Sequence, residues 1–439
     1  MAEHVWRNWA GNVEAVGFDA LAPGSTEEVA QAVTLAARTG RRVKAIGSGH
    51  SFTAIGEPVD LQLQLHRLTG VVSHDPATGR VRVRAGSRLR DLNRELHALG
   101  LAFPNLGDYD GQTVSGAIAT GTHGTGAGLT GLAGFVRGVE IVLADGSVVR
   151  FDDDHEPDLV PAVAVGLGAL GVVTELELQC VPTFLLRAVE APARLDELLQ
   201  RLDETVDGTD HFEFYFFPHT DLVQTKTNTR VEDLRERAPL PRWRAVLDDR
   251  LIANTAFEGL NRVVTRAPAA IPRINQVSAR ALSRRTYTDF SYAVLATERT
   301  VRFTESEFAM ARGDVAHVLR ELRDYFRRAE QQVAFPIEVR FTGPDDRWLS
   351  TGYERANAYV AVHQYHRRSN QPYFQDFWAM LPDDARPHWG KLHDLGADEL
   401  RRLYPRFDDF VALRDRLDPD RVLASDYLDR VLGPRSALP

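Results

Sequence analysis

Two glycine-rich loops near the start of the chain constrain its fold more than any other feature of the sequence. The first, residues 45–51, reads Ala-Ile-Gly-Ser-Gly-His-Ser, and the second, residues 113–126, is dense in Gly, Thr and Ala. Each loop presents backbone N–H groups with little side chain in the way, and such a surface can hold the diphosphate of a dinucleotide. A pair of tight turns would leave the same pattern. Each loop also holds a histidine, His50 or His123, and small hydroxyl residues, so both interpretations stay open on these residues alone.

Short strands and helices are expected around the two loops. Ser25 and Glu28 have the spacing of a capping box, which predicts a helix from Ser25 to about Arg38. Past residue 182 the chain has fewer glycines, more aromatic residues and longer strands, so we place a domain boundary there. Residues 225–290 are Arg-rich and weakly periodic, which predicts loops and short helices. Further predicted elements are the strands 42–46 and 59–65, the hairpins 71–85 and 139–151, the helix 87–98, and the strands 211–217, 301–310 and 335–341.

Composition and charge exclude several classes of protein. With 439 residues, 44% of them hydrophobic, the chain is long enough for two domains, and its net charge of −9 argues against nucleic-acid binding. The single cysteine, Cys180, excludes a disulfide framework and a thiolate metal cluster and predicts a reducing compartment. The N-terminus lacks the apolar stretch of a secretory signal, and no apolar run reaches the roughly 20 residues of a membrane span. We therefore expect a cytoplasmic protein without a transmembrane segment.

The common nucleotide and hydrolase motifs give no support to other enzyme classes. Gly126-Ala-Gly128-Leu-Thr-Gly131 matches the G-x-G-x-x-G pattern of nicotinamide-binding folds, but no apolar strand precedes it and Asp145-Gly146 predicts a hairpin turn. The sequence contains no P-loop, zinc-protease or serine-hydrolase motif. His363 and His366 lie three residues apart and would face opposite ways on a strand, so no metal site is expected.

Two short motifs in the second half hold candidate site residues. Glu338 and Arg340 are two residues apart in a predicted strand, which places both on one face with apolar residues on the other. An ordinary cross-strand pair on a surface strand would give the same pattern. The turn His388-Trp-Gly-Lys391 holds one of only three lysines, against forty-nine arginines. Another of the three, Lys44, precedes the first glycine loop and is expected at the surface.

Five segments together resemble the vanillyl-alcohol-oxidase-type flavoproteins. Within them the chain is similar to the aldonolactone oxidoreductases, the L-gulono-1,4-lactone and D-arabinono-1,4-lactone oxidases or dehydrogenases, with alditol oxidase as a near relative. The resemblance implies an α+β fold: an FAD-binding domain of two subdomains at 12–182, a cap domain with a large antiparallel sheet at 183–416, and a C-terminal segment, 417–439, that returns to the FAD domain. The matching segments are Ala45–Phe52, Gly116–Gly126, Leu167–Thr174, Ile337–Arg340 and Arg386–Lys391.

The same resemblance implies an FAD cofactor and most of its contacts. The first glycine loop would hold the diphosphate, and His50 matches the histidine that many members attach covalently to the 8α-methyl group of the flavin. The second loop and Val173 would complete the site, and His388 matches a position near the flavin. The residues implied to bind the cofactor are Ala45, Ile46, Gly47, Ser48, Gly49, His50, Ser51, Val114, Gly116, Ala117, Thr120, Gly121, His123, Gly124, Val173 and His388.

The oxidation of a secondary alcohol determines which side chains the site needs besides those that bind the cofactor. Hydride moves from the C–H bond to flavin N5 while the hydroxyl proton leaves, and the reduced flavin becomes anionic. The site therefore needs a cation beside the flavin and polar groups around the hydroxyl. By resemblance, Lys391 and Arg340 are the candidate catalytic cations and proton carriers, and Glu338 is the candidate residue that binds substrate hydroxyls.

Two departures from alditol oxidase favour a lactone over a linear polyol. Ala117 stands where alditol oxidase has a site serine and cannot donate a hydrogen bond, and Tyr365, a predicted substrate residue, stands where a threonine is expected. The predicted substrate is therefore a sugar lactone oxidised at C2, with an alditol oxidase and a non-catalytic flavoprotein as alternatives. Oxygen, a quinone and a cytochrome all stay open as the acceptor of the flavin's electrons.

Overall fold

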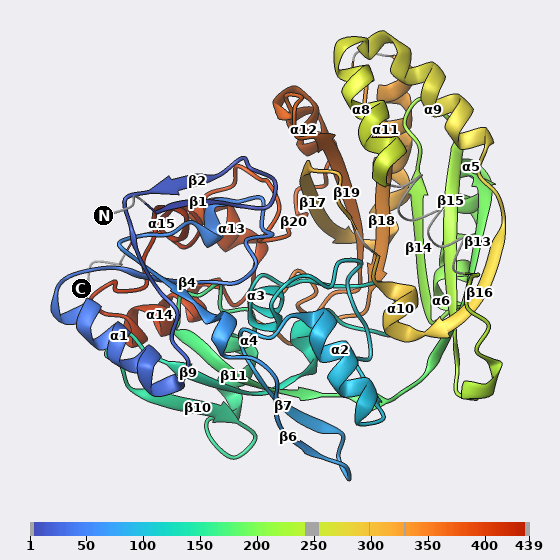
Figure 1. The fold of residues 1–439 in the computed structure, drawn as a ribbon. Coiled ribbons are helices and arrows are strands. Elements are labelled where there is room, and N and C mark those ends of the chain that lie inside the picture. Colours follow the sequence, from blue (N-terminus) through green and yellow to red (C-terminus); the bar gives the residue numbers. More distant parts are fainter. Residues whose placement is uncertain (1–3, 242–253, 298, 329–330, 435–439) are drawn as a thin grey trace.

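The computed structural model describes residues 4–241, 254–297, 299–328 and 331–434, and it divides them into two parts that lie side by side (Figure 1). Residues up to about 182 form small sheets with short helices, at the left of Figure 1. Most of the following residues form one large sheet with its own helices, at the right. Helices from the end of the chain, drawn in red, return to the left-hand part, and both ends of the chain lie there.

A small parallel sheet leads into the first glycine loop. Its strands are β3 (Asp19–Leu21), β5 (Leu61–Gln64) and β4 (Val43–Ile46), in that order. Helix α1 (Thr26–Arg38) packs on it through Val29 and Val33. The Ser25 hydroxyl accepts the Glu28 N–H at 3.2 Å, which confirms the predicted start of this helix. The loop begins directly after β4, because Gly47 cannot support the strand as the preceding β-branched residue does.

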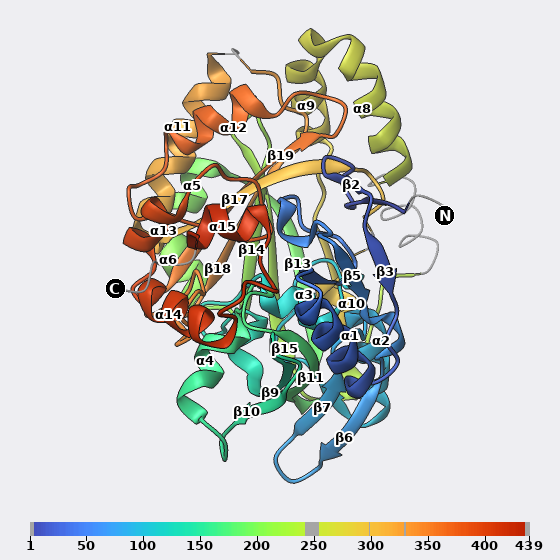
Figure 2. The ribbon, with the colours of Figure 1, turned by 90° about the vertical axis from the view of Figure 1, so that its left-hand side faces the viewer.

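A second sheet in this part has five antiparallel strands and lies at the bottom of the molecule in Figures 1 and 2. Its strands are β10 (Val148–Asp152), β9 (Val136–Val142), β11 (Val172–Gln179), β7 (Arg80–Arg84) and β6 (Val71–Asp75). β9 and β10 form a hairpin around the predicted turn Asp145-Gly146. The G-x-G-x-x-G segment therefore leads into a hairpin, as the sequence predicted, and not into a βαβ unit. Short elements beside these sheets are β1 (Val5–Arg7), β2 (Glu14–Val16), β8 (Leu101–Ala102), β12 (Val181–Pro182), α2 (Leu89–Ala98), α3 (Val114–Ala119) and α4 (Val160–Ala164).

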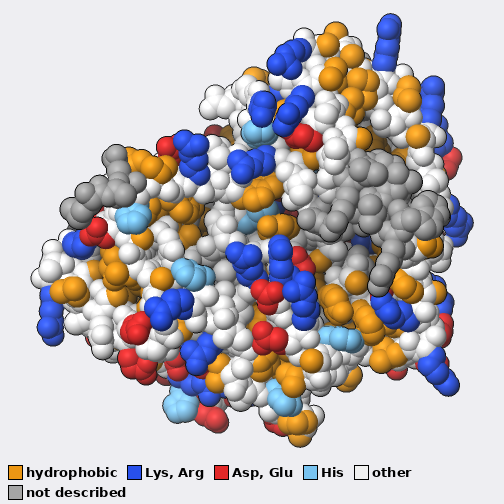
Figure 3. All heavy atoms as spheres, viewed as in Figure 1, with side chains coloured by type: hydrophobic (Ala, Val, Ile, Leu, Met, Phe, Trp, Pro, Cys, Tyr) orange, Lys and Arg blue, Asp and Glu red, His pale blue; other side chains and the backbone are white. Residues whose placement is uncertain are grey.

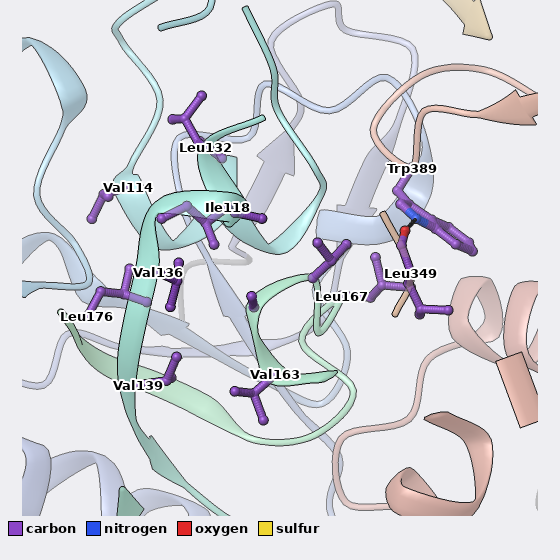
Figure 4. Close-up of a cluster of buried hydrophobic side chains, with 14 of the residues drawn as sticks. Val114, Ile118, Leu132, Val136, Val139, Val163, Leu167, Leu176, Leu349 and Trp389 are labelled. Atoms are coloured by element: carbon purple, nitrogen blue, oxygen red, sulfur yellow. Dashed lines mark hydrogen bonds between the residues drawn. The ribbon is translucent and has the colours of Figure 1, made fainter. Parts of the chain in front are cut away.

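The hydrophobic core of the first part includes residues from the second half of the chain (Figure 4). Trp389, from the His-Trp-Gly-Lys turn, is 1% exposed, and its Nε1 donates to the carbonyl of Leu349 at 2.7 Å. Leu186 and Ala188 of the large sheet belong to the same cluster. The turn that holds Lys391 is thus anchored in a core that both parts share. Other labelled members are Val114, Ile118, Leu132, Val136, Val139, Val163, Leu167 and Leu176.

The large sheet has eight antiparallel strands, which confirms the predicted α+β fold. In order they are β16 (Arg285–Phe290), β13 (Leu185–Arg194), β15 (Leu222–Val231), β14 (His211–Phe216), β18 (Ile337–Thr342), β19 (Asn357–Tyr365), β17 (Phe303–Ala311) and β20 (Arg386–Pro387). Apolar side chains on one face form a cluster with four helices. These helices are α5 (Leu195–Gln200), α6 (Leu202–Asp207), α11 (Val315–Arg327) and α12 (Gln371–Trp378).

The two faces of the central strands differ sharply in polarity. On β18, Ile337, Val339 and Phe341 point into the helix-covered cluster, whereas Glu338 and Arg340 face the first part of the chain. Both charged residues are buried, at 5% and 7% exposure. The alternative of an ordinary surface strand is therefore wrong, because the first part of the chain covers the polar face.

Residues 225–290 are more regular than their sequence predicts. Their first residues complete the long strand β15, their last form β16, and α8 (Phe257–Arg266), α9 (Ile271–Arg280) and α10 (Ser291–Leu295) lie among or beside them. β15 was missed because its centre, Thr225-Lys-Thr-Asn-Thr, has no apolar alternation, and its pairing with β13 and β14 holds it as a strand. The part of the predicted segment at 242–253 lies outside the described residues.

The last helices connect the end of the chain to its beginning. They are α13 (Ala397–Leu403), α14 (Phe407–Leu417) and α15 (Asp426–Leu432). The Val43 N–H of β4 donates to the Val422 carbonyl at 2.7 Å, and Val422 and Leu423 join the core beneath α1. None of the described helices has the length and apolarity needed to cross a membrane. Figure 3 shows basic and acidic side chains interspersed over one face of the molecule.

Candidate active site

A cavity lies where the two glycine loops meet the polar face of the large sheet. The three predicted catalytic residues, Glu338, Arg340 and Lys391, all line it, although they come from β18 and from a turn about fifty residues later. Its walls therefore combine both parts of the chain. The other polar or aromatic side chains that line it are Trp9, His50, Ser51, Asp108, Tyr109, Gln112, Thr120, Thr122, His123, Arg299, Phe303, Glu305, Glu307, His363 and His388.

Strand register places Arg340 among carboxylates. Arg340 lies opposite Glu213 of β14, and its Nε donates to Glu213 Oε2 at 3.0 Å. Its Nη2 forms an ion pair with Glu338 and lies 3.6 Å from Asp108 Oδ2. These carboxylates outweigh the cost of burial and hold the pKa of Arg340 well above its ordinary value. Arg340 is therefore a permanent, rigidly held cation.

Glu338 differs from the other carboxylates beside Arg340. Burial raises the pKa of Glu338 above its ordinary value, although Arg340 opposes the rise. Its Oε1 also accepts the Tyr215 hydroxyl at 3.0 Å. For Asp108, burial acts in the same sense, but Arg299 and Arg340 together lower its pKa below the ordinary range. Glu338 is thus the member of this cluster best suited to take up a proton.

Lys391 is oriented by the edge of β17. The turn before it runs along that strand, since His388 N–H donates to the Glu307 carbonyl at 3.0 Å and Leu392 N–H to the Glu305 carbonyl at 2.9 Å. The Lys391 Nζ donates to Glu305 Oε2 at 2.5 Å. Burial would lower the pKa of Lys391, but Glu305 and Glu307 raise it above its ordinary value. Lys391 is therefore held as an ammonium group at the cavity wall.

Two histidines contact the same strand. His363 lies opposite Glu305 in the register, with its Nε2 3.5 Å from Glu305 Oε1. His123, from the second glycine loop, has its Nδ1 2.9 Å from the Gly124 carbonyl and its Nε2 3.2 Å from Glu307 Oε1. Both ring nitrogens therefore face acceptor oxygens, and His123 is held between the second glycine loop and β17.

One trio within the described ranges could hold a metal ion, although the sequence predicts none. The ligand atoms of His123, Glu307 and His388 lie within 4.8 Å of one another. His388 Nδ1, however, already accepts the Gly390 N–H at 3.0 Å, and His123 is paired with Glu307. Burial also lowers the pKa of His388 to about 3, so its ring stays neutral. Hydrogen bonding within the cavity accounts for this trio without an ion.

The first glycine loop presents His50 to the cavity. The Trp9 N–H donates to the Gly49 carbonyl at 2.7 Å, and the Phe52 N–H donates to the Gly390 carbonyl at 2.7 Å, so the loop is tied at both ends. The His50 ring stacks on Tyr109 at 4.2 Å. Burial and the charge of Lys391 lower the pKa of His50 to about 4, and its Nδ1 has no hydrogen-bond partner among the described residues. His50 is therefore a neutral imidazole with a free ring nitrogen.

Behind His50 the two glycine loops enclose a cleft that fits a dinucleotide. A Cβ on Gly47 would lie 2.2 Å from Thr113 Oγ1, so the loops approach each other as closely as glycine allows. Lys44, expected at the surface, is instead 4% exposed at the wall of this cleft. Its Nζ and Thr113 Oγ1 are both buried without a hydrogen-bond partner. Buried polar atoms without partners are costly, so the two atoms indicate a binding site for a polar ligand.

The cleft continues into an apolar pocket lined by Ala45, Val173 and other small or aliphatic residues. Most residues predicted to bind the cofactor line the cleft, this pocket or the cavity. Val114, Gly121 and Gly124 line none of them. The remaining thirteen are Ala45, Ile46, Gly47, Ser48, Gly49, His50, Ser51, Gly116, Ala117, Thr120, His123, Val173 and His388.

Tyr365 does not line the cavity. Its side chain is fully buried in an apolar cluster with Phe52, Phe303 and Phe335, and its hydroxyl donates to Glu258 Oε1 at 2.8 Å. Its predicted contact with the substrate therefore has no support in this geometry.

Several cavity residues were missed by the sequence analysis. Glu305 and Glu307 stand two apart, as Glu338 and Arg340 do, but Thr304 and Ser306 beside Glu305 are polar, so the apolar alternation that marks β18 is absent there. His363 was considered only as a metal ligand. Asp108 comes from an irregular segment, and its ion pair with Arg299, from the other half of the chain, leaves no local pattern.

Comparison with known proteins shows the class of enzyme to which this chain belongs. Residues 20–152 match a family of FAD-binding domains, and the protein is an FAD-dependent oxidoreductase. Residues 176–431 match the D-arabinono-1,4-lactone oxidase family, and the chain belongs to it.

The relatives cover nearly the whole chain. This chain is 41% identical over 431 residues to L-gulono-1,4-lactone dehydrogenase from Mycobacterium tuberculosis, and the match covers 98% of this chain and 99% of that protein. It is 32% identical to an alditol oxidase from a Streptomyces species, covering 97% and 98%. Among solved structures, a cholesterol oxidase from Brevibacterium sterolicum superposes with a TM-score of 0.79 at 16% identity, covering 98% and 97% of the two chains, so the fold is shared.

Proposed function

We propose that the protein oxidises the C2 hydroxyl of an aldono-1,4-lactone, such as L-gulono- or D-arabinono-1,4-lactone, to an ascorbate-type enediol. One observation carries the proposal: the buried polar face of the sheet places Glu338, Arg340 and Lys391 around one cavity beside the glycine loops. The name of the relative at 41% identity supports a lactone, and the alditol oxidase is more distant at 32%.

FAD fits the cleft through this chain's own groups. The first glycine loop and Thr113 would hold the cofactor's polar middle, and the pocket lined by Ala45 and Val173 would take an apolar end. When bound, FAD supplies the acceptor for a hydride from the substrate C–H bond. His50, neutral and with a free ring nitrogen, is our candidate for the covalent attachment.

The charged residues have separate roles in this proposal. Lys391, held as ammonium by Glu305, supplies positive charge where negative charge develops. Glu338, with its raised pKa, binds the reacting hydroxyl and accepts its proton. Arg340 fixes Glu338 and binds a neighbouring oxygen of the lactone.

The substrate is tested by anaerobic bleaching of the flavin with L-gulono-1,4-lactone, D-arabinono-1,4-lactone and xylitol. Bleaching by a lactone and not by xylitol is expected. Bleaching by xylitol alone would establish an alditol oxidase, and no bleaching by any sugar would indicate a non-catalytic flavoprotein. Adding air, a quinone or cytochrome c to the reduced protein then identifies the electron acceptor, for which we propose one of these three.

Lys391→Ala tests the role of the ammonium group. We expect the variant to retain its flavin but to reduce it about a hundredfold or more slowly, because one preorganised charge is lost. Stopped-flow absorbance under anaerobic conditions measures the rate, with Lys391→Arg as the charge-retaining control. A wild-type rate in Lys391→Ala would exclude a role in the chemical step.

Acid precipitation tests the covalent bond to His50. We expect the yellow colour to remain with the precipitated wild-type protein and to pass into the supernatant from His50→Ala. Colour that stays with His50→Ala would rule out this attachment. We also propose a cytoplasmic location, supported by the single, buried thiol of Cys180.

A further inference from the structure

Lys44 is a buried charged group that the proposed chemistry does not use. It lies on β4, three residues before Gly47 of the first glycine loop, and its side chain is 4% exposed. Its Nζ has no hydrogen-bond partner and no ion-pair partner among the described residues. An ammonium group buried without a partner is strongly unfavourable, so either the amine loses its proton or an anion joins it.

Lys44 belongs to the wall of the proposed cofactor cleft. The side chain lines the cleft together with Gly47, Ser48, Gly49 and Thr113. On the other side lies Gly168, which has a φ of +68°, and a Cβ there would be 3.5 Å from Lys44 Nζ. That distance is an ordinary van der Waals contact, so Gly168 packs beside the Lys44 amine at the wall of the cleft.

We propose that Lys44 forms an ion pair with the diphosphate of FAD, and that it is the charged partner missing from a loop that otherwise offers only backbone N–H groups. Three observations support this: burial, the absence of a partner, and a position in the cleft between His50 and the apolar pocket. The inference rests on the cofactor and not on the substrate. It stands whether a lactone or a polyol is oxidised.

The proposed ion pair predicts that the protein takes up protons when FAD binds. Burial lowers the pKa of Lys44 to about 8 without bound anion, so at pH 8 about half of the molecules carry a neutral amine. Binding of an anion favours the ammonium form and raises this pKa. FAD binding at pH 8 should therefore take up about half a proton per site through Lys44, and close to none at pH 6.

The experiment uses the full-length chain with His50→Ala, so that flavin can be removed without breaking a covalent bond. Titration calorimetry with FAD in two buffers of different ionisation enthalpy, at pH 6 and pH 8, measures the uptake. The same titrations are repeated with Lys44→Met added. We expect about half a proton at pH 8 with Lys44 and none with the methionine. If the protein that retains Lys44 takes up no proton when FAD binds at pH 8, the proposal is overturned. This result does not depend on the Lys44→Met variant.

Binding affinities for FAD, riboflavin and adenosine test whether Lys44 acts on the diphosphate or on another part of the cofactor. We expect Lys44→Met to weaken FAD at least about tenfold, as loss of a buried charge partner does, while riboflavin and adenosine change less than about twofold. Equal weakening of all three would mean that Lys44 only shapes the cleft, which would refute the ion pair. Arg38→Met, which removes an exposed charge from α1, is the matched control and should leave all three affinities unchanged.

Lys44→Met should also change stability in opposite senses with and without cofactor. The flavin-free variant should unfold at the same or a higher temperature, because an uncompensated buried charge is gone. The rise in unfolding temperature on adding FAD should be smaller than with lysine. A flavin-free variant that is strongly destabilised would contradict this account and assign Lys44 a structural role.

Discussion

The substitution Glu305→Gln tests the electrostatic basis of the candidate site. Glu305 is 5% exposed, its Oε2 is 2.5 Å from Lys391 Nζ, and its Oε1 is 3.5 Å from His363 Nε2. Removing one partner of a buried pair costs about 3–5 kcal/mol, and the amide retains an accepting oxygen, so we expect a loss of about 3 kcal/mol in the free energy of unfolding. Urea unfolding of the flavin-bound protein at pH 7 measures it.

The pH dependence of this loss follows from the two pKa shifts. Burial would raise the pKa of Glu305, but Lys391 and His363 lower it below 4.5, so its contribution is present above pH 4.5 and is lost as the pH falls. The pKa of Lys391 is raised above 10.5, so its contribution is present below pH 10.5 and is lost as the pH rises through the folded value. The difference between wild type and Glu305→Gln is therefore largest between about pH 5 and pH 10.

A matched control separates this effect from a general loss of charge. Glu14 pairs with Arg7 at 2.8 Å, but the two side chains are 46% and 64% exposed, so Glu14→Gln should change stability by less than about 1 kcal/mol. A loss below about 1 kcal/mol in Glu305→Gln, or the same loss at pH 3 as at pH 7, would show that the Lys391 pair does not carry the charge balance assigned to it.

Two further predictions concern the cofactor cleft and the thiol. Gly47→Ala should lower the flavin content of the purified protein severalfold, measured by the ratio of flavin to protein absorbance, because the new Cβ would lie 2.2 Å from Thr113 Oγ1. Gly128→Ala, with no atom within 4 Å of the added Cβ, should load normally, and full loading of both variants would contradict the crowding argument. Burial raises the pKa of the Cys180 thiol to about 12, so native protein should react with iodoacetamide on the order of a thousandfold more slowly than unfolded protein. Similar rates in the two states would show that the thiol is accessible.

Local patterns in the sequence predict those features whose cause is local. The cap at Ser25 sets the start of α1, and the alternation around Glu338 and Arg340 places both on one face of β18. The resemblance to known flavoproteins predicts the large antiparallel sheet and brings His50, Lys391 and the glycine loops into one site.

The rest depends on which segments meet. Alternation puts Lys44 on one face of β4 but does not reveal that the second glycine loop and the turn at Gly168 cover that face. Asp108 and Arg299 form an ion pair across 190 positions of sequence, and neither has a local signal. Tyr365 shows the converse error: its position in a motif suggested the cavity, but its side chain points into an apolar cluster.

The hydrogen bond between Val43 and Val422 has a consequence for how the protein matures. The strand that leads into the cofactor loop is completed by residues from the end of the chain, and Tyr427 of α15 donates to the carbonyl of Trp389 at 3.0 Å beside the Lys391 turn. In a nascent chain whose last helix is still inside the ribosome, the cleft would therefore be incomplete. We expect flavin incorporation to follow synthesis of α15, because residues around that helix complete the cleft.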